Sequence, residues 1–255
     1  MRLSALALYP VKGAAAVAAA RAELDALGLA GDRRFCLAMP GGRVFTQRDD
    51  ASLARMRARI DDWALRLDFD GEALEVPLRG FTREASIRVW SRDALAHAAG
   101  GAAEATLSRW FGRPLQLARL GRPVEREGAL LAFGDAAALL VTNSASLEAL
   151  NARLDFPVPM DRFRPNLVIA DAPAFGEDAW RRLRIGEAIL APVHACGRCE
   201  VTTIDQELGA SMGGEPLRTL SRLRMQDGEA VFGVRYAVER PGELRVGDEV
   251  SALPQ

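Results

Sequence analysis

The sequence predicts a mixed, mainly β protein with a barrel-like architecture and a few peripheral helices. Short runs of apolar and β-branched residues recur along the chain, and Gly or Pro lies near most of them. Helical spacing of leucines occurs in few segments and does not alternate regularly with the strand signals. A doubly wound parallel sheet requires that alternation, so it is disfavoured.

The expected strands begin with the short apolar stretch before Pro10, and the residues around Cys36 predict another. Further strands are expected at 86–90, 167–169, 188–190, 200–204, 231–234 and 244–246. Helices are expected at 104–111, at 144–154, and from Pro216 onward with Leu217, Leu220 and Leu223 facing inward. Asn143 or Ser144 can cap the second helix.

Two segments bear on the division of the chain. The alanine-rich residues 14–27 favour a helix by propensity alone, although Gly13 and Gly28 bound a segment that also fits two extended pieces. Residues 117–126 are polar and contain Gly and Pro, so they are the expected junction. We therefore expect an N-terminal unit at 1–117 and a C-terminal unit at 118–255.

Composition excludes several classes of protein. The 255 residues are 49% hydrophobic and 26% charged, which is typical of a globular chain. The 33 basic and 34 acidic residues nearly cancel, whereas a nucleic-acid-binding protein usually carries a basic excess. No apolar run approaches the roughly 20 residues of a membrane helix. Because the N-terminus resembles a strand rather than a signal peptide, we expect a cytoplasmic location.

Three cysteines form no disulfide framework, and Cys36 is expected to be a buried core thiol. Cys196 and Cys199 form one CxxC pair. A zinc ribbon needs a second pair and an iron–sulfur cluster needs four ligands. A thioredoxin-like motif needs a helix after the pair, where the sequence predicts a strand. Either the pair is structural, or one thiolate serves a metal whose other ligands lie elsewhere, with Arg198 favouring the thiolate.

Cations stand beside turn residues at three other points. Lys12 is the only lysine in the chain, and Arg33 follows Gly31 and Asp32. Arg164 and Asn166 flank a rigid proline before an expected strand. Each alone fits a solvated charge or a salt-bridged turn. Together with one thiolate, they suit a large anionic cofactor.

Five motifs, in this order and spacing, resemble the MOSC family over nearly the whole chain. They are Tyr-Pro-Val-Lys at 9–12, Gly-Leu-Ala-Gly-Asp-Arg-Arg at 28–34, Phe-Thr-Gln-Arg at 45–48, Phe-Arg-Pro-Asn at 163–166, and Cys-Gly-Arg-Cys with Thr-Thr-Ile-Asp within 196–205. The resemblance is closest to members with an N-terminal MOSC β-barrel domain, which include mitochondrial amidoxime-reducing components and bacterial reductases of N-hydroxylated compounds. It implies that domain at 1–117, a MOSC β-barrel at 118–255, and strand rather than helix at 15–24.

The resemblance also implies a molybdenum cofactor, a pyranopterin whose dithiolene holds the metal. The second cysteine of the pair, Cys199, is then the protein ligand to molybdenum, for which a soft thiolate is suitable, and Cys196 is not a ligand. The implied cofactor-binding residues are Lys12, Arg33, Arg164, Asn166, Gly197, Arg198, Cys199 and Arg235. The backbone near Ala136 and Ala137 aligns with a further contact stretch, and Gly13 replaces a common serine.

The implied activity is reduction of a small N-hydroxylated substrate, N–OH to N–H, with Cys199 and Asp205 as catalytic residues. Asp205 is expected either to relay protons or merely to cap a strand end. Electrons are expected from a separate ferredoxin- or flavoprotein-type donor, because the chain lacks the cysteines of a ferredoxin domain. Two alternatives remain open: a sulfur or molybdenum-cofactor carrier that uses Cys199, and a β-barrel binding module whose CxxC is structural.

Overall fold

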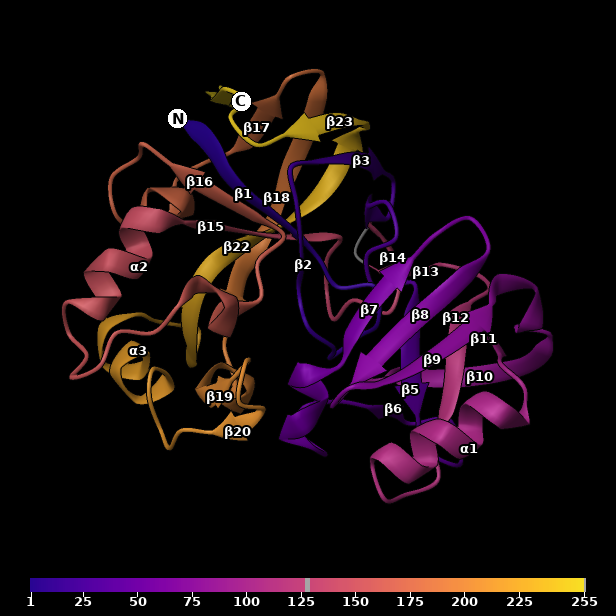
Figure 1. Ribbon diagram of the computed structural model, residues 1–255. Helices are drawn as coiled ribbons and strands as arrows, with labels where there is room; N and C mark the ends of the chain where they lie inside the picture. Colours follow the sequence, from indigo (N-terminus) through magenta and orange to yellow (C-terminus); the bar gives the residue numbers. More distant parts are fainter. Residues whose placement is uncertain (127–128, 255) are drawn as a thin grey trace.

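The computed structural model describes residues 1–126 and 129–254 and shows two β structures side by side (Figure 1). The larger sheet is formed mostly by the C-terminal half of the chain, and β21 (Met225–Gln226) pairs with one of its strands. Across the sheet the order is β2 (Val17–Ala19), β1 (Arg2–Leu8), β16 (Leu167–Ala170), β15 (Leu139–Asn143), β22 (Glu229–Arg240), β18 (Ala188–Gly197), β17 (Arg182–Ile185) and β24 (Val250–Leu253).

The N-terminal structure combines two smaller sheets with α1 (Gly101–Trp110) against them (Figure 1). One sheet has the order β10 (Arg83–Val89), β11 (Arg92–Ala98), β12 (Gln116–Leu120), β5 (Phe35–Ala38) and β6 (Val44–Phe45). The other joins β7 (Arg57–Ile60), β8 (Ala64–Phe69) and β9 (Glu72–Pro77). Phe35, Phe45, Phe69 and Phe111 fill the space between them, which accounts for the apolar runs in these strands.

Short elements complete the fold. Small sheets are formed by β23 (Gly242–Arg245), β3 (Arg21–Asp25) and β4 (Gly28–Leu29), by β13 (Val124–Arg126) and β14 (Ala129–Leu131), and by β19 (Ile204–Asp205) and β20 (Ala210–Ser211). The 3₁₀ turns are η1 (Ala51–Arg55), η2 (Leu78–Gly80), η3 (Met160–Phe163), η4 (Gly176–Asp178) and η5 (Glu200–Thr203), and the other α-helices are α2 (Ser144–Asn151) and α3 (Leu217–Leu223).

The two halves of the sequence are interleaved in space. The strand β1 pairs antiparallel with β16, so the first residues of the chain belong to the larger sheet. Leu3 and Leu6 of β1 are buried there with Val141 and Tyr236. The expected division between residues 117 and 118 falls inside β12, whose residues pair with β11 and β5. The division therefore stays a prediction, and part of the expected junction is strand.

The mainly β class and the helices were predicted correctly, with α2 capped by Asn143, whose side chain accepts a hydrogen bond from the Ala145 N–H at 3.1 Å. The alanine-rich segment forms β2 and β3, as the family resemblance implied, because pairing with β1 and β23 outweighs helix propensity. Two local predictions were wrong. Leu223 of α3, expected to face inward, is 39% exposed. Residues 200–203 form the turn η5 rather than a strand.

Side-chain hydrogen bonds explain the turn at η5. The hydroxyl of Thr202 donates to the Cys199 carbonyl at 2.9 Å, and that of Thr203 donates to the Glu200 carbonyl at 2.8 Å. Such bonds give the backbone an alternative to a sheet even where β-branched residues favour a strand. The turn begins directly after Cys199, so it fixes the position of that residue.

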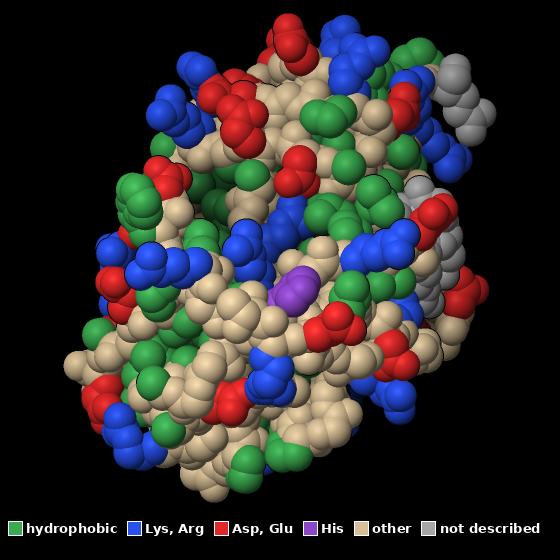
Figure 2. Space-filling view, turned by 90° about the vertical axis from the view of Figure 1, so that its right-hand side faces the viewer, with side chains coloured by type: hydrophobic (Ala, Val, Ile, Leu, Met, Phe, Trp, Pro, Cys, Tyr) green, Lys and Arg blue, Asp and Glu red, His purple; other side chains and the backbone are tan. Residues whose placement is uncertain are grey.

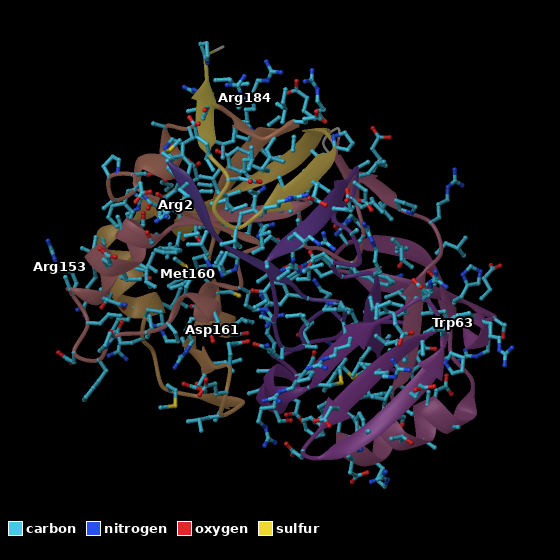
Figure 3. All side chains as sticks on the ribbon, turned by 45° about the horizontal axis from the view of Figure 1, so that its top comes forward. Arg2, Trp63, Arg153, Met160, Asp161 and Arg184 are labelled. Atoms are coloured by element: carbon cyan, nitrogen blue, oxygen red, sulfur yellow. The ribbon has the colours of Figure 1, made fainter. Side chains whose placement is uncertain are left out.

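None of the helices in the described ranges is long and apolar enough to cross a membrane. Figure 2 shows basic and acidic side chains interspersed over one face of the molecule, without a broad region of one sign. Exposed Trp63 lies at the outer side of the N-terminal structure, on the opposite side from Met160 and Asp161 of η3 (Figure 3).

Candidate functional site

The buried ring of Tyr9 organises two of the predicted site residues. The guanidinium carbons of Arg33 and Arg164 each lie 4.3 Å from its centroid. Its hydroxyl donates to the Pro165 carbonyl at 3.0 Å. Burial raises the pKa of Tyr9 to about 12, against the opposing effect of the two arginines. Tyr9 is therefore a neutral support on which the two cations are stacked.

Arg33 and Arg164 both occupy the left-handed region of the backbone, with φ of 48° and 54°. This conformation is uncommon for residues other than glycine and is often found at functional sites. Arg33 forms an ion pair with buried Asp32, while Arg164 donates to the Ala14 carbonyl at 2.7 Å and to Gln206 Oε1 at 2.8 Å. Burial lowers the pKa of Arg164 to about 10, so it remains a cation at neutral pH.

Asn166 ties this pair to the larger sheet. Its Oδ1 accepts hydrogen bonds from Arg33 Nη1 at 3.0 Å and from the Leu140 N–H at 3.1 Å. Its Nδ2 donates to the Ala7 carbonyl at 3.1 Å. Because Asn166 is buried and joins three segments that are distant in sequence, it positions Arg33 as well as any ligand.

Lys12 joins the same cluster through Asp135. Its Nζ lies 2.5 Å from Asp135 Oδ1, and the same oxygen accepts the indole N–H of Trp90 at 2.9 Å. Burial lowers the pKa of Lys12, and Asp135 opposes that effect. The charge and hydrogen bond of Lys12 outweigh the effect of burial on Asp135 and hold the pKa of that carboxyl far below its usual range.

The first cysteine of the pair lies between two arginines. Cys196 Sγ is 2.9 Å from Arg198 Nη1 and 3.3 Å from Arg235 Nε. Burial alone raises the pKa of Cys196, but the two guanidiniums bring it below its ordinary value. Arg198 also donates to the Phe163 carbonyl at 2.8 Å. Cys196 thus gathers two predicted cofactor-binding residues without being the predicted metal ligand.

Gly197 leaves room for a neighbouring side chain. A Cβ at this position would lie 1.8 Å from Glu229 Oε2 and 2.7 Å from Glu229 Cδ. These atoms are the flexible end of an exposed side chain, so a larger residue would displace the carboxylate of Glu229. Steric crowding alone therefore does not require glycine between Cys196 and Arg198.

The second cysteine is reached by a side chain from the other β structure. Arg48, a few residues after β6, donates from Nη2 to Cys199 Sγ at 2.9 Å. Its Nε lies 3.3 Å from Glu200 Oε1, and its guanidinium carbon lies 4.8 Å from the centroid of the Trp90 ring. Cys199 is partly exposed, so its sulfur is accessible beside a fixed cation.

A pair of amides joins the two structures beside this contact. Gln47 Nε2 donates to Gln206 Oε1 at 2.9 Å, and Gln206 Nε2 donates to Gln47 Oε1 at 3.1 Å. Gln47 also donates to the Gly13 carbonyl at 2.7 Å, next to Lys12. Gly13 has a φ of +86°, a conformation that glycine adopts without strain and the common serine would not.

Asp205 is held by its own loop. Its Oδ1 accepts the N–H groups of Glu207 and Leu208 at 3.0 and 2.9 Å, and its Oδ2 accepts Arg162 Nη2 at 2.8 Å. The pKa of Asp205 is lowered most by the Leu208 N–H, and also by the Glu207 N–H and by Arg162. An ionised carboxylate with both oxygens engaged favours the second expectation, a group that closes a turn.

The structure thus brings the predicted residues into one connected cluster. Asp135 acts electrostatically on Arg33, Arg164 and Arg235 as well as on Lys12. Among the described residues, Arg198 Nε is buried without a hydrogen-bond partner. Such an orphaned donor beside several cations suits an anionic ligand. Within residues 1–126 and 129–254, no group of three or more His, Cys, Asp or Glu side chains could hold a metal ion.

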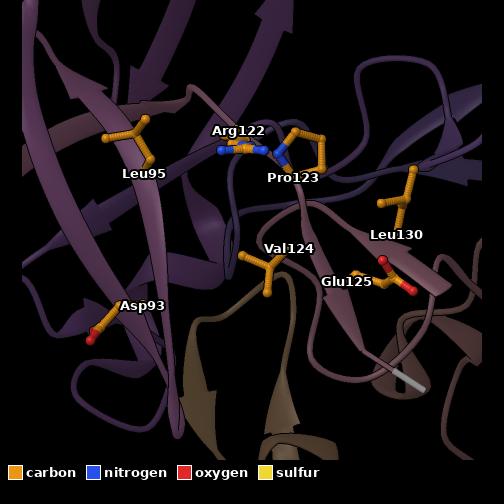
Figure 4. Close-up of a pocket in the computed structure, with 7 residues that line it drawn as sticks. All are labelled: Asp93, Leu95, Arg122, Pro123, Val124, Glu125 and Leu130. Atoms are coloured by element: carbon orange, nitrogen blue, oxygen red, sulfur yellow. The ribbon is translucent and has the colours of Figure 1, made fainter. Parts of the chain in front are cut away.

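Sequence reasoning missed Arg48, Trp90 and Asp135 as site residues. Arg48 stands inside one of the five motifs, and Asp135 directly precedes the alanines at the expected backbone contact, so each had a weak signal. Separately, a cavity of about 550 Å³ is lined by none of the site residues (Figure 4). Its lining is Asp93, Leu95, Arg122, Pro123, Val124, Glu125 and Leu130.

The fold and the site define a mainly β protein with a cation-rich site that carries two cysteines where two β structures meet. Family models identify it further: the MOSC N-terminal beta barrel domain matches residues 1–114, and the MOSC domain matches residues 129–251. The chain belongs to the MOSC family, among its members with the N-terminal barrel domain, as the motifs predicted.

Two relatives agree with this assignment. The chain is 32% identical to mitochondrial amidoxime-reducing component 1 of Xenopus laevis, over 97% of this chain and 81% of that protein. It is 31% identical to mitochondrial amidoxime-reducing component 1 of Homo sapiens, over 97% and 82%. Among solved structures, the YUAD protein from Bacillus subtilis matches with a TM-score of 0.48 and 12% identity, over 98% of this chain and 93% of that one.

Proposed function

We propose that this chain is a molybdenum-cofactor-dependent reductase of N-hydroxylated compounds. Relatives that match nearly its whole length are named amidoxime-reducing components, and an amidoxime carries an N–OH group. The observation that carries the proposal is the partly exposed thiol of Cys199 beside a connected cluster of buried cations. Two electrons and two protons convert N–OH into N–H and water, so the site must deliver both.

The residues present suit an anionic pterin cofactor. Lys12, Arg33 and Arg164 would hold its acidic groups, together with Asn166, Arg198 and Arg235. The unpartnered Nε of Arg198 supports this assignment, because a buried donor gains most from a new acceptor. Cys199 would bind the metal through its soft thiolate. When bound, the cofactor supplies the two-electron redox chemistry that cleaves the N–O bond.

The chain's own residues orient this site. Arg48 holds the side chain of Cys199 from the opposite β structure, and it remains close to any group bound beside that sulfur. Asp205 fixes Arg162, which donates to the Thr203 carbonyl at 3.2 Å and so supports the turn η5. We assign Asp205 this positioning role; a proton relay through it is the alternative that a conservative substitution tests.

The electron donor is proposed to be a separate ferredoxin- or flavoprotein-type protein. The balanced charge supports the expectation that no nucleic acid is bound. The relatives' names place them in mitochondria, so they lend no support to the cytoplasmic location expected from the sequence, which stays a prediction. No membrane partner is proposed.

The test is metal and pterin analysis of protein expressed in a host that makes the cofactor, with reduction of benzamidoxime by reduced viologen. Molybdenum and pterin near one per chain, with turnover, would support the reductase. Persulfide on Cys199 without molybdenum would instead support the sulfur-carrier alternative. Absence of both would overturn the proposal in favour of a binding module.

A further inference from the structure

Trp90 occupies a position that turn formation does not explain. It stands at the tip of the hairpin of β10 and β11, in which Val89 pairs with Arg92, and it has a φ of 57°. Two-residue hairpin turns favour Asn or Gly in this conformation, and a bulky residue there is strained. The side chain is nevertheless 56% exposed, so burial of the ring offers little compensation.

The exposed ring is held firmly at its edge and on one face. Its N–H donates to Asp135 Oδ1 at 2.9 Å, and Arg48 lies over the ring at 4.8 Å from the centroid. Arg92 fixes the hairpin tip by donating to the Gly134 and Asp135 carbonyls at 2.8 and 3.0 Å. A ring fixed in this way loses little conformational freedom when a ligand stacks on it.

The ring also lies close to the proposed metal ligand. Arg48 joins the two, since its Nη2 is 2.9 Å from Cys199 Sγ while its guanidinium carbon covers the ring. With ordinary bond lengths, the ring centroid is at most about 9 Å from the sulfur. Because Arg48 occupies the face that leads to this sulfur, an aromatic ring stacked on the other face must extend its conjugated N–OH group past the edge of the indole to approach Cys199.

We propose that Trp90 is the binding platform for the substrate, and that it selects planar, conjugated N-hydroxylated compounds over non-planar aliphatic ones; this inference rests on the proposed function. A flat ring lies on the free face of the indole, whereas a puckered ring of similar size makes poorer contact. The strain at Trp90 is then the cost of presenting an aromatic face where Asn or Gly would serve the turn better.

The experiment compares the binding of benzamidoxime with that of cyclohexanecarboxamidoxime, which has a similar size and a puckered ring. Calorimetry on the cofactor-loaded chain should show benzamidoxime binding about tenfold more weakly to Trp90→Asn, which corresponds to about 1.4 kcal/mol. Binding of the cyclohexyl compound should change less than twofold. Trp90→Phe, which keeps a ring, should retain most of the affinity for benzamidoxime.

The matched control is Trp63→Asn, because Trp63 is an exposed tryptophan on the far side of the same β structure (Figure 3). It should bind both compounds as the parent chain does. Trp90→Asn should unfold at the same temperature as the parent or a higher one, since Asn tolerates this φ. If Trp90→Asn weakens the binding of both compounds equally, or weakens the binding of neither, the proposed platform is overturned.

A second arm distinguishes the substrate's ring from the cofactor's pterin, which is also planar. Protein from a host without the cofactor should show the same Trp90-dependent binding of benzamidoxime. If loading the cofactor abolishes that binding, the indole belongs to the pterin and the proposal fails. Selective binding of benzamidoxime without any reduction would contradict the proposed function but not the platform. Turnover of both compounds without selective binding would contradict the platform but not the proposed function.

Discussion

Arg48 and Cys199 are 151 residues apart in sequence, yet Arg48 Nη2 lies 2.9 Å from Cys199 Sγ. The contact crosses from one β structure to the other, beside the amide pair of Gln47 and Gln206. The accessible sulfur is therefore positioned by both structures together. Substitutions in the N-terminal structure should affect the chemistry at Cys199.

Arg48→Ala should lower kcat/KM for benzamidoxime at least tenfold, because Cys199 loses its hydrogen-bond donor and Trp90 loses the cation on its face. Arg48→Lys should recover part of the loss, since a lysine keeps the charge but not the planar fork. Steady-state assays with reduced viologen measure this. Arg59→Ala, an exposed arginine of β7, is the control; similar losses at both positions would contradict the assignment.

Cys199→Ser should leave the fold intact and abolish reduction, because it removes the proposed metal ligand. Cys196→Ser should be milder, since the hydroxyl still accepts from Arg198 and Arg235 at a buried position. Molybdenum content and turnover of the two variants give the comparison. Equal loss of activity with molybdenum retained in both would show that Cys199 has no special role.

Lys12→Ala and Arg164→Ala should each reduce the pterin content of the purified protein without unfolding the chain. A hydrogen bond to a charged group contributes about 1.5–3 kcal/mol, which corresponds to roughly ten- to hundredfold weaker cofactor binding. Arg184→Ala, an exposed arginine far from the cluster, should retain full pterin content (Figure 3). Normal pterin content in both cluster variants would argue against the cluster as the cofactor site.

Asp205 should contribute to stability in a pH-dependent way. Its pKa is lowered in the folded chain, so its contribution is present above the unfolded pKa of about 3.9 and is lost as the pH falls through the folded value. Urea unfolding at pH 7 should show Asp205→Asn destabilised by about 1–3 kcal/mol, with the difference shrinking in acid. Unchanged stability combined with lost turnover would instead favour the proton relay.

The isolated chain should not turn over with a nicotinamide donor, whereas reduced viologen should support reduction. The sequence has no nicotinamide-binding GxGxxG motif and only three cysteines. A separate donor protein needs only a brief, polar encounter, so its support of turnover should weaken with added salt. Robust turnover with NADH alone would reveal a second redox site in the chain.

The fold class could be predicted because β-branched runs and Asn143 at a helix start act locally. The turn at residues 200–203 could not be predicted, because it depends on hydrogen bonds from the hydroxyls of Thr202 and Thr203 to the backbone of that same turn. Within the site, Lys12, Arg33 and Arg164 could be predicted because each stands in one of the five motifs and its charge is evident from the sequence.

Pairing between distant segments was the main limit on the predicted site. The contacts of Asp135 with Lys12 and Trp90 join residues more than forty positions apart, and no local pattern encodes them. The same holds for Arg48 on Cys199. Such partners follow only from the arrangement of the two β structures.

The place of β1 constrains how the chain reaches its native state during synthesis. Leu6 pairs with Leu167, so the first strand emerges from the ribosome long before its partner β16 exists. It must wait while the intervening residues are made, and closing so long a loop slows folding. A C-terminal half made alone would leave one edge of β16 unpaired, an edge prone to aggregation, and should recover solubility when a peptide of residues 1–10 is supplied.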